Sequence, residues 1–334
     1  MPAVPIDEQE LSGRAKEVLV AARPGADLGP LRPLQGGTSS ITYRADLDLP
    51  DGTREPVVLK VAPAGLDPVR NRDVLRQARL LRSLDGTGLP VPRVLAEHLG
   101  APPEIPPFFV MSFEQGECIE PSTLSADARL SPEEVRSREL DAARILGSLH
   151  VLDPVALGLG DEPEVSPADE LDRWVQSFAA CDEDLRAGSD DVRDLLAQTT
   201  PPAAASALIH GDFRLGNTLS SGSAVVAVID WEIWARSDPR VDLGWFLLMA
   251  NPDPILGRSQ AEGMPSNEEL IQTYEEARGT TVHDFGWFEA LVRYKQAAIS
   301  ALLARNARRR GEPSTTNEGI GNLLVAARAR LTPG

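Results

Sequence analysis

Apolar residues recur with the 3.6-residue period of an amphipathic helix in several separate stretches of the chain. The predicted helices with the longest pattern cover residues 6–22, 133–149 and 284–305. Another helix is expected from Asp67, whose side chain would cap it ahead of Pro68 in the first turn, to about Leu84. Residues 171–198 also have a helical pattern, with an interruption at Gly188.

Short runs of apolar and β-branched residues, bounded by glycine, proline or serine, predict the strands. These runs occupy residues 56–61, 88–95, 107–112 and 218–229. In the last run the turn Ser221-Gly222-Ser223 separates two β-prone halves, which predicts a hairpin. The acidic stretch 160–170 contains two prolines and is expected to be a loop. With 334 residues, the chain can hold one large domain or two lobes around a cleft.

Three polar residues lie beside the predicted hairpin. Asp212 and Asn217 precede it, and Asp230 follows it. Because the strands of a hairpin run antiparallel, Asn217 and Asp230 should meet near its open end. Carboxylate and amide oxygens suit Mg²⁺, which also takes substrate phosphates as ligands. Asp212 is then free to accept a proton from a nucleophile, so the pattern predicts a magnesium site beside a general base.

The composition narrows the classes of protein and partner. Hydrophobic residues make up 42% of the sequence and charged residues 25%, which is typical of a soluble globular protein. The net charge of −17 argues against a nucleic-acid partner, since nucleic-acid phosphates need a basic surface. The excess of acidic residues would suit a cationic substrate, or it would simply keep the surface solvated.

The sequence also carries signals about cellular location. No apolar stretch approaches the length that spans a bilayer, so no membrane partner is expected. The first residues have no basic end followed by an apolar run, which argues against a signal peptide. Cys118 and Cys181 are far apart and lack the spacing of metal ligands, which favours reduced thiols. These features predict a cytoplasmic protein.

Residues 210–217 have the pattern His-Gly-Asp-x-x-x-x-Asn, which resembles the catalytic loop of the aminoglycoside phosphotransferase family. The longer run HGDFRLGN…IDWE…DPRVDLGW is most similar to the subgroup that includes kinase-like domains fused to acyl-CoA dehydrogenases. The resemblance covers residues 30–310. It implies an α+β, bilobal protein-kinase-like fold, with a small β-rich ATP-binding lobe over residues 1–112. A larger, mostly helical lobe over residues 113–334 would carry the catalytic and substrate-binding residues.

The resemblance assigns roles around the predicted hairpin. Asp212 would take the proton of an acceptor hydroxyl, and Asn217 and Asp230 would hold Mg²⁺ across the ATP phosphates. Arg214 would reach the transferring phosphoryl group as a fixed cation, or it would form a salt bridge within its loop. Asp242 begins an apolar helical run and is expected to cap it, and the resemblance adds a contact with the catalytic loop.

The resemblance also implies where ATP binds. A glycine-containing hairpin would cover the phosphates with Gly36, Gly37, Thr38 and Ser39. Lys60 would contact the non-transferred phosphates, and the adenine would meet the chain near Met111 and Phe113. The family pairs this lysine with a glutamate of the following helix, but Gln77 stands at that position here. Glutamine accepts a hydrogen bond but carries no charge, and Asp73, one helical turn earlier, is the alternative partner.

These resemblances imply an ATP-dependent phosphotransferase that transfers the γ-phosphate to a hydroxyl of a small molecule. Aminoglycosides, other amino alcohols, sugars and hydroxyacyl compounds all fit the family, and the fold does not choose among them. The alternative is a nucleotide-binding pseudokinase that acts as a scaffold, which Gln77 alone supports. A protein kinase is disfavoured, because the segment after Asp230 lacks an Ala-Pro-Glu element and a long activation loop.

Overall fold

The computed structural model describes residues 6–34, 40–121, 130–252, 260–312 and 317–331. The chain forms two compact units. Unit 1 consists of Met1–Glu117, Thr218–Ser221 and Val225–Trp234. Unit 2 consists of Cys118–Asn217, Gly222–Ala224 and Ala235–Gly334. Unit 1 thus includes two segments from the second half of the chain.

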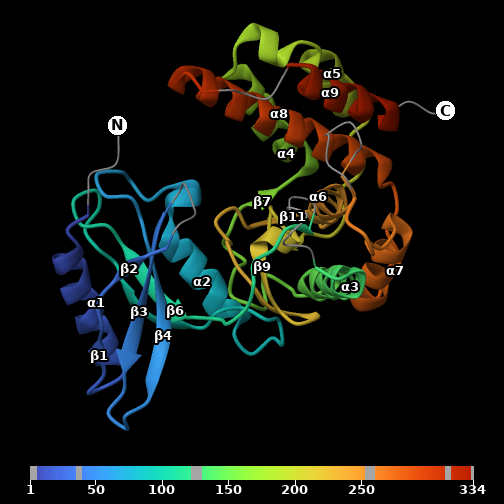
Figure 1. Cartoon of the computed structure of the whole chain (residues 1–334). Coiled ribbons are helices and arrows are strands. Elements are labelled where there is room, and N and C mark those ends of the chain that lie inside the picture. The colour runs from blue at the N-terminus through green and yellow to red at the C-terminus, as the bar shows by residue number, and fades with distance from the viewer. Residues whose placement is uncertain (1–5, 35–39, 122–129, 253–259, 313–316, 332–334) are drawn as a thin grey trace. The chain divides into compact units, whose positions relative to one another are not determined.

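Unit 1 is built on an antiparallel sheet (Figure 1). Its strands are β1 (Asp27–Leu28), β2 (Arg32–Pro33), β3 (Ile41–Asp48), β4 (Arg54–Val61), β5 (Val94–His98) and β6 (Phe108–Ser112). The strand order is β1-β3-β4-β6-β5, and β2 also pairs with β3. Alternate residues of β3 and β4 point to one face, where they form a core with the apolar side of α1 (Glu8–Ala22). The helix α2 (Val74–Leu84) follows the 3₁₀ turn η1 (Arg70–Arg72) and contacts β5 and β6.

Unit 2 is mostly helical. Its helices are α3 (Pro132–Leu149), α4 (Pro167–Ala179), α5 (Ser189–Gln198), α6 (Arg240–Ala250), α7 (Asn267–Arg278), α8 (Gly286–Arg310) and α9 (Asn317–Leu331), with 3₁₀ turns η4 (Glu183–Arg186) and η5 (Leu215–Asn217). The long helix α8 packs against α4, α6 and α9, and α3 packs against α7 (Figure 1). A small sheet places β11 (Ala235–Ser237) between β7 (Glu164–Val165) and β8 (Ala207–Ile209). None of the helices in the described ranges is both long enough and apolar enough to span a bilayer.

Several sequence predictions are confirmed by these elements. The expected helices at residues 6–22, 133–149 and 284–305 are α1, α3 and α8. The expected hairpin is formed by β9 (Thr218–Ser221) and β10 (Ala224–Val228), which pair with each other. Gly222 in its turn has a φ of 57°, a left-handed conformation that glycine adopts without steric cost. The expected α+β fold class is confirmed.

Other predictions were wrong in their boundaries. The helix expected from Asp67 begins only at Val74, where the Asp73 side chain caps it by accepting from the Arg76 amide at 3.0 Å. The strand expected over 88–95 is shifted to Val94–His98, because the prolines that precede it cannot donate to a ladder. The stretch 160–170 is not only loop, since β7 and the first turn of α4 lie in it.

Candidate functional site

The loop of residues 210–217 in unit 2 holds Asp212 between two donors. The indole Nε1 of Trp245 donates to Oδ1 of Asp212 at 2.6 Å, and Nδ2 of Asn217 donates to Oδ2 at 2.8 Å. The Asp212 amide donates to Nδ1 of His210 at 3.2 Å, so His210 braces the loop as well. The side chain of Asp212 is 30% exposed. The structure therefore presents an oriented carboxylate that solvent or a substrate can reach, as a general base requires.

Asp242 fixes the start of this loop. It is fully buried, and its two oxygens accept from the backbone amides of His210 and Gly211 at 2.5 and 2.7 Å. Burial opposes its charge, but the backbone hydrogen bonds and the nearby imidazoles of His150 and His210 outweigh burial and hold the pKa of Asp242 below its ordinary value. Pro239, not Asp242, stands at the start of α6, so the expected capping role was wrong. The contact with the loop that the resemblance implied is present.

From the sequence, Arg214 would either reach the transferring phosphoryl group or form a salt bridge within its loop. The structure shows it in salt bridges. Its Nη1 lies 3.2 Å from Oε2 of Glu120, and its Nε lies 3.7 Å from Oδ1 of Asp212. Glu120 also accepts from the Gly216 amide at 3.2 Å. Sequence reasoning missed Glu120, because it is 94 residues from Arg214 and belongs to no motif. The guanidinium is 30% exposed, so it remains accessible while it is held beside Asp212.

In unit 1, Lys60 and Asp230 form an ion pair. Lys60 lies on β4, is only 8% exposed, and its Nζ is 2.9 Å from Oδ1 of Asp230. Asp230 has a φ of 64°, which is uncommon for a residue with a side chain and marks a position worth a functional explanation. The neighbouring Trp231 donates to the Val228 carbonyl at 2.9 Å and closes this turn. The lysine thus has an acidic partner that sequence spacing did not predict.

Neither of the two partners considered for Lys60 from the sequence is this acid. Asp73 caps α2 through the Arg76 amide. Gln77 is 3% exposed, and within the described residues its Nε2 has no hydrogen-bond partner. Arg76 ties α2 to the segment after Asp230, because its guanidinium stacks 3.9 Å from the Trp234 ring centre and donates to the Trp234 carbonyl at 3.0 Å.

The remaining residues expected to bind ATP are only partly described. Gly36, Gly37, Thr38 and Ser39 lie outside the described residues. Met111 pairs with Val58 near the end of β6, and both Met111 and Phe113 are half-buried. The guanidinium of Arg44 lies 4.4 Å from the centre of the Phe113 ring. The assignment of Met111 and Phe113 to an adenine site stays a prediction.

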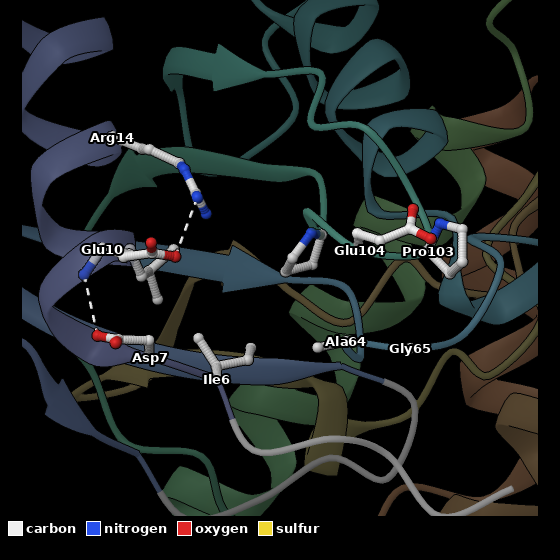
Figure 2. A pocket seen from close by; sticks show the side chains of 10 residues that line it. Ile6, Asp7, Glu10, Arg14, Ala64, Gly65, Pro103 and Glu104 are labelled. Carbon is white, nitrogen blue, oxygen red and sulfur yellow. Dashed lines mark hydrogen bonds and ion pairs between the residues drawn. The ribbon is translucent and has the colours of Figure 1, made fainter.

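A pocket of about 420 Å³ lies elsewhere in unit 1 (Figure 2). Its lining includes Asp7 and Arg14 of the α1 region, Gly65 after β4, and Pro103 and Glu104 before β6. Of the residues assigned to phosphoryl transfer that the structure describes, none lines this pocket.

Asn217 in unit 2 and Asp230 in unit 1 each carry an oxygen donor of a kind that magnesium accepts, and their joint binding of the ion stays a prediction. Nδ2 of Asn217 donates to both the carbonyl and the carboxylate of Asp212, each at 2.8 Å, which fixes the amide and leaves its oxygen for a cation. Asp230 supplies a carboxylate whose side chain is 39% exposed. These are hard oxygen donors of the kind that Mg²⁺ takes together with phosphate oxygens.

Comparison with known proteins shows the family to which the chain belongs. The model of the phosphotransferase enzyme family (APH) matches residues 30–288, and the chain belongs to that family. The resemblance read from the sequence is thereby confirmed. A crystal structure from Ralstonia eutropha, provisionally described as an aminoglycoside phosphotransferase, covers 98% of this chain and 96% of its own with a TM-score of 0.73 and 22% identity. A spectinomycin phosphotransferase in complex with ADP and spectinomycin has a TM-score of 0.60 at 17% identity, over 97% and 99% of the two chains.

The curated relatives that match include proteins named as acyl-CoA dehydrogenase family members. Acyl-CoA dehydrogenase family member 11 of Gallus gallus is 30% identical over 260 residues, which are 73% of this chain and 33% of the relative. The protein of the same name in Homo sapiens is 28% identical over 266 residues, which are 75% of this chain and 34% of the relative. The chain therefore spans about a third of the length of these relatives.

Proposed function

We propose that this protein transfers the γ-phosphate of ATP to a hydroxyl group of a small molecule. The observation that carries the proposal is the Asp212 carboxylate, which Trp245 and Asn217 orient and which remains partly exposed. A base for phosphoryl transfer must be fixed and yet reachable by the acceptor. Membership in a phosphotransferase family supports this role. Structural neighbours bound to ADP or ATP support a nucleotide as the phosphate donor.

In this mechanism Asp212 accepts the proton of the acceptor hydroxyl as the oxygen bonds to the γ-phosphorus of ATP. The bond between that phosphorus and its bridging oxygen breaks, and ADP leaves with the bonding electrons. Asn217 and Asp230 would hold Mg²⁺, which supplies charge neutralisation at the phosphates. Lys60 would exchange part of its contact with Asp230 for the non-transferred phosphates. Arg214, already paired with Glu120 and Asp212, offers a fixed positive charge near the base.

The class of acceptor is the open part of the proposal. The family as a whole acts on hydroxylated compounds, and the relatives named for acyl-CoA dehydrogenases add hydroxyacyl compounds to the candidates. Aminoglycosides, other amino alcohols and sugars remain in the set. An antibiotic acceptor does not follow from the family name, because one fold serves many substrates.

The test is ATP consumption measured against a panel of these four classes of hydroxylated compound, with the matched variants Asp212→Asn and Asp190→Asn. Asp190 is an exposed acid of the same unit. We expect Asp212→Asn to lower turnover by about 100-fold or more, which is the scale of general-base catalysis, with nucleotide binding retained. Asp190→Asn should behave as wild type. Turnover by Asp212→Asn at the wild-type rate would refute the assignment of the base.

The metal assignment is tested by calorimetry of ATP binding with and without Mg²⁺. Asp230→Ala removes the charged ligand and should abolish the gain in affinity that Mg²⁺ provides. An unchanged effect of Mg²⁺ would mean that the metal binds elsewhere. Binding of MgATP without turnover on any acceptor would instead favour the pseudokinase alternative.

A further inference from the structure

A buried lysine lies under the catalytic loop of unit 2 and has no role in the mechanism above. The sequence has 33 basic residues, and its lysines are Lys16, Lys60 and Lys295. Lys295 lies in the middle of α8 and is 3% exposed. Removing an ammonium from water is costly unless it has partners. A lysine at this position therefore needs an explanation in its contacts.

The first contact is with the backbone that precedes Asp212. Nζ of Lys295 donates to the carbonyl oxygen of Gly211 at 2.7 Å, and the amide of the same glycine donates to Asp242 at 2.7 Å. Two buried side chains of opposite charge thus hold one residue from both ends. Gly211 has a φ of 86°, which glycine adopts readily and other residues do not. Because Gly211 directly precedes Asp212, this clamp fixes the point from which the Asp212 side chain extends.

The second contact is with the indole that orients Asp212. Nζ of Lys295 lies 3.9 Å from the centre of the Trp245 ring, within the range of a cation–π interaction. The same indole donates its N–H to Oδ1 of Asp212 at 2.6 Å. A second ring, that of Trp174, lies 5.4 Å from Nζ. One ammonium therefore contacts both the backbone and the side chain that support the proposed base.

Charged groups from three segments face Lys295: Glu170 and Arg173 of α4, Asp212 of the loop and Asp242 of α6. Burial lowers the pKa of Lys295, and the three acids only partly offset that effect. The folded protein therefore binds this proton less tightly than the unfolded chain. Between the two pKa values a rise in pH stabilises the folded state through this group, so loss of the Lys295 proton does not by itself unfold the protein.

We propose that Lys295 is a positioning residue for phosphoryl transfer, which holds Gly211 and Trp245 and thereby keeps the Asp212 carboxylate in one orientation toward the acceptor. This inference rests on the proposed function, since it takes Asp212 as the base. Lysine suits the position because its ammonium is a compact point charge that can donate to a carbonyl and lie on a ring at once, whereas the planar guanidinium of arginine is larger.

The test compares Lys295→Met, which keeps an unbranched side chain one atom shorter and removes the charge, with Lys16→Met as the matched control. Lys16 is an exposed lysine of α1 that pairs with Asp27. The probe is MgATP with water as the acceptor, so no substrate needs to be known. We expect Lys295→Met to lower turnover by about 10- to 100-fold, the scale of a base displaced by a fraction of an ångström to one ångström, with the KM for ATP changed less than about twofold. Lys16→Met should match wild type in both.

A second measurement uses the wild-type protein and does not need the variant to fold. With isotope-labelled lysine, the three side chains give few enough signals to be followed separately by NMR during a pH titration. We expect ATP hydrolysis to fall with rising pH at the pH where the Lys295 signal titrates, while the thermal unfolding midpoint is retained. A fall in hydrolysis over a pH range where the Lys295 signal does not change would overturn the proposal.

A third readout is independent of turnover. In protein labelled at its five tryptophans, the indole N–H signal of Trp245 reports its hydrogen bond to Asp212. We expect this signal to move in Lys295→Met and to stay in place in Lys16→Met. A Trp245 signal unchanged in Lys295→Met overturns the proposal, as does wild-type turnover or an equal loss of turnover and ATP affinity. Absence of both ATP binding and hydrolysis in the wild type would refute the proposed function, and the Trp245 signal would still decide whether Lys295 supports the loop.

Discussion

The carboxylate of Asp242 should be among the most sensitive positions of unit 2, and two substitutions test it in a graded way. Asp242→Asn keeps one acceptor oxygen but turns an amide NH₂ toward the second backbone donor. Asp242→Ala leaves both the His210 and the Gly211 amides without this acceptor. The two variants therefore remove one and two backbone hydrogen bonds from the same buried place.

The expected magnitudes follow from these contacts. A hydrogen bond to a charged group contributes about 1.5–3 kcal/mol, and a buried donor left without a partner costs a similar amount. Asp242→Asn should thus lower the free energy of unfolding by about 2 kcal/mol, and Asp242→Ala by about 4 kcal/mol. Both should also slow phosphoryl transfer, because the same two amides set the position of the loop that carries Asp212.

The assay is urea unfolding followed by tryptophan fluorescence, with Asp190→Asn as the control. Asp190 is an exposed acid paired with Arg193, and an exposed ion pair contributes about 0–1 kcal/mol. If Asp242→Ala destabilises no more than Asp190→Asn, the two backbone hydrogen bonds do not support the loop as argued. If the free energy of unfolding falls in this graded way but turnover is unchanged, the two hydrogen bonds stabilise the loop without setting its catalytic geometry.

Two further predictions concern Gln77 and His150. Gln77→Met removes a buried amide whose Nε2 lacks a partner within the described residues, so it should raise the free energy of unfolding by about 1 kcal/mol. If Gln77 contacts the nucleotide, the same variant should also weaken ADP binding. A lower free energy of unfolding would show that the amide is paired. Burial lowers the pKa of His150 below its ordinary value of 6.5, so the folded protein binds this proton less tightly than the unfolded chain. The stability that the neutral imidazole contributes is fully present above pH 6.5 and is lost as the pH falls through the pKa of His150 in the folded protein. Between pH 7.5 and about pH 5 the free energy of urea unfolding should therefore fall less in His150→Gln than in wild type or in the exposed control His283→Gln. An equal fall in all three proteins would contradict this account.

The sequence was most informative where structure depends on local pattern. The predicted helices that became α3 and α8 have long apolar periods, and burial of one face is what forms such a helix. The start of α2 was misplaced because two local signals compete. Asp67 before a proline resembles a helix start, but Asp73 makes the capping bond to the Arg76 amide, and a 3₁₀ turn comes first.

The candidate site shows more clearly that local sequence pattern does not predict contacts between distant residues. Asp212 and Asn217 are five residues apart, and their hydrogen bond could be expected from the motif alone. The acid that pairs with Lys60 is 170 residues away, and the contact exists only because of tertiary packing. Sequence spacing carries no information on such a pair unless a resemblance supplies it. The sequence therefore indicates Gln77 or Asp73 as the partner of Lys60, and Asp230 as a metal ligand only.

A chemical signal did exist for one of the missed residues. Trp245 lies in an apolar run and looks like an ordinary core residue, but a buried indole N–H needs an acceptor. Around α6 the apolar residues offer none, so the acceptor had to come from another segment, and Asp212 is an acid that needs a donor. Lys295 poses the same question in a helix whose other inward residues are mostly apolar. A buried polar group within an apolar run needs a hydrogen-bond partner. For Trp245 of α6 and Lys295 of α8 the partners lie in the catalytic loop, which is rich in polar side chains and backbone groups.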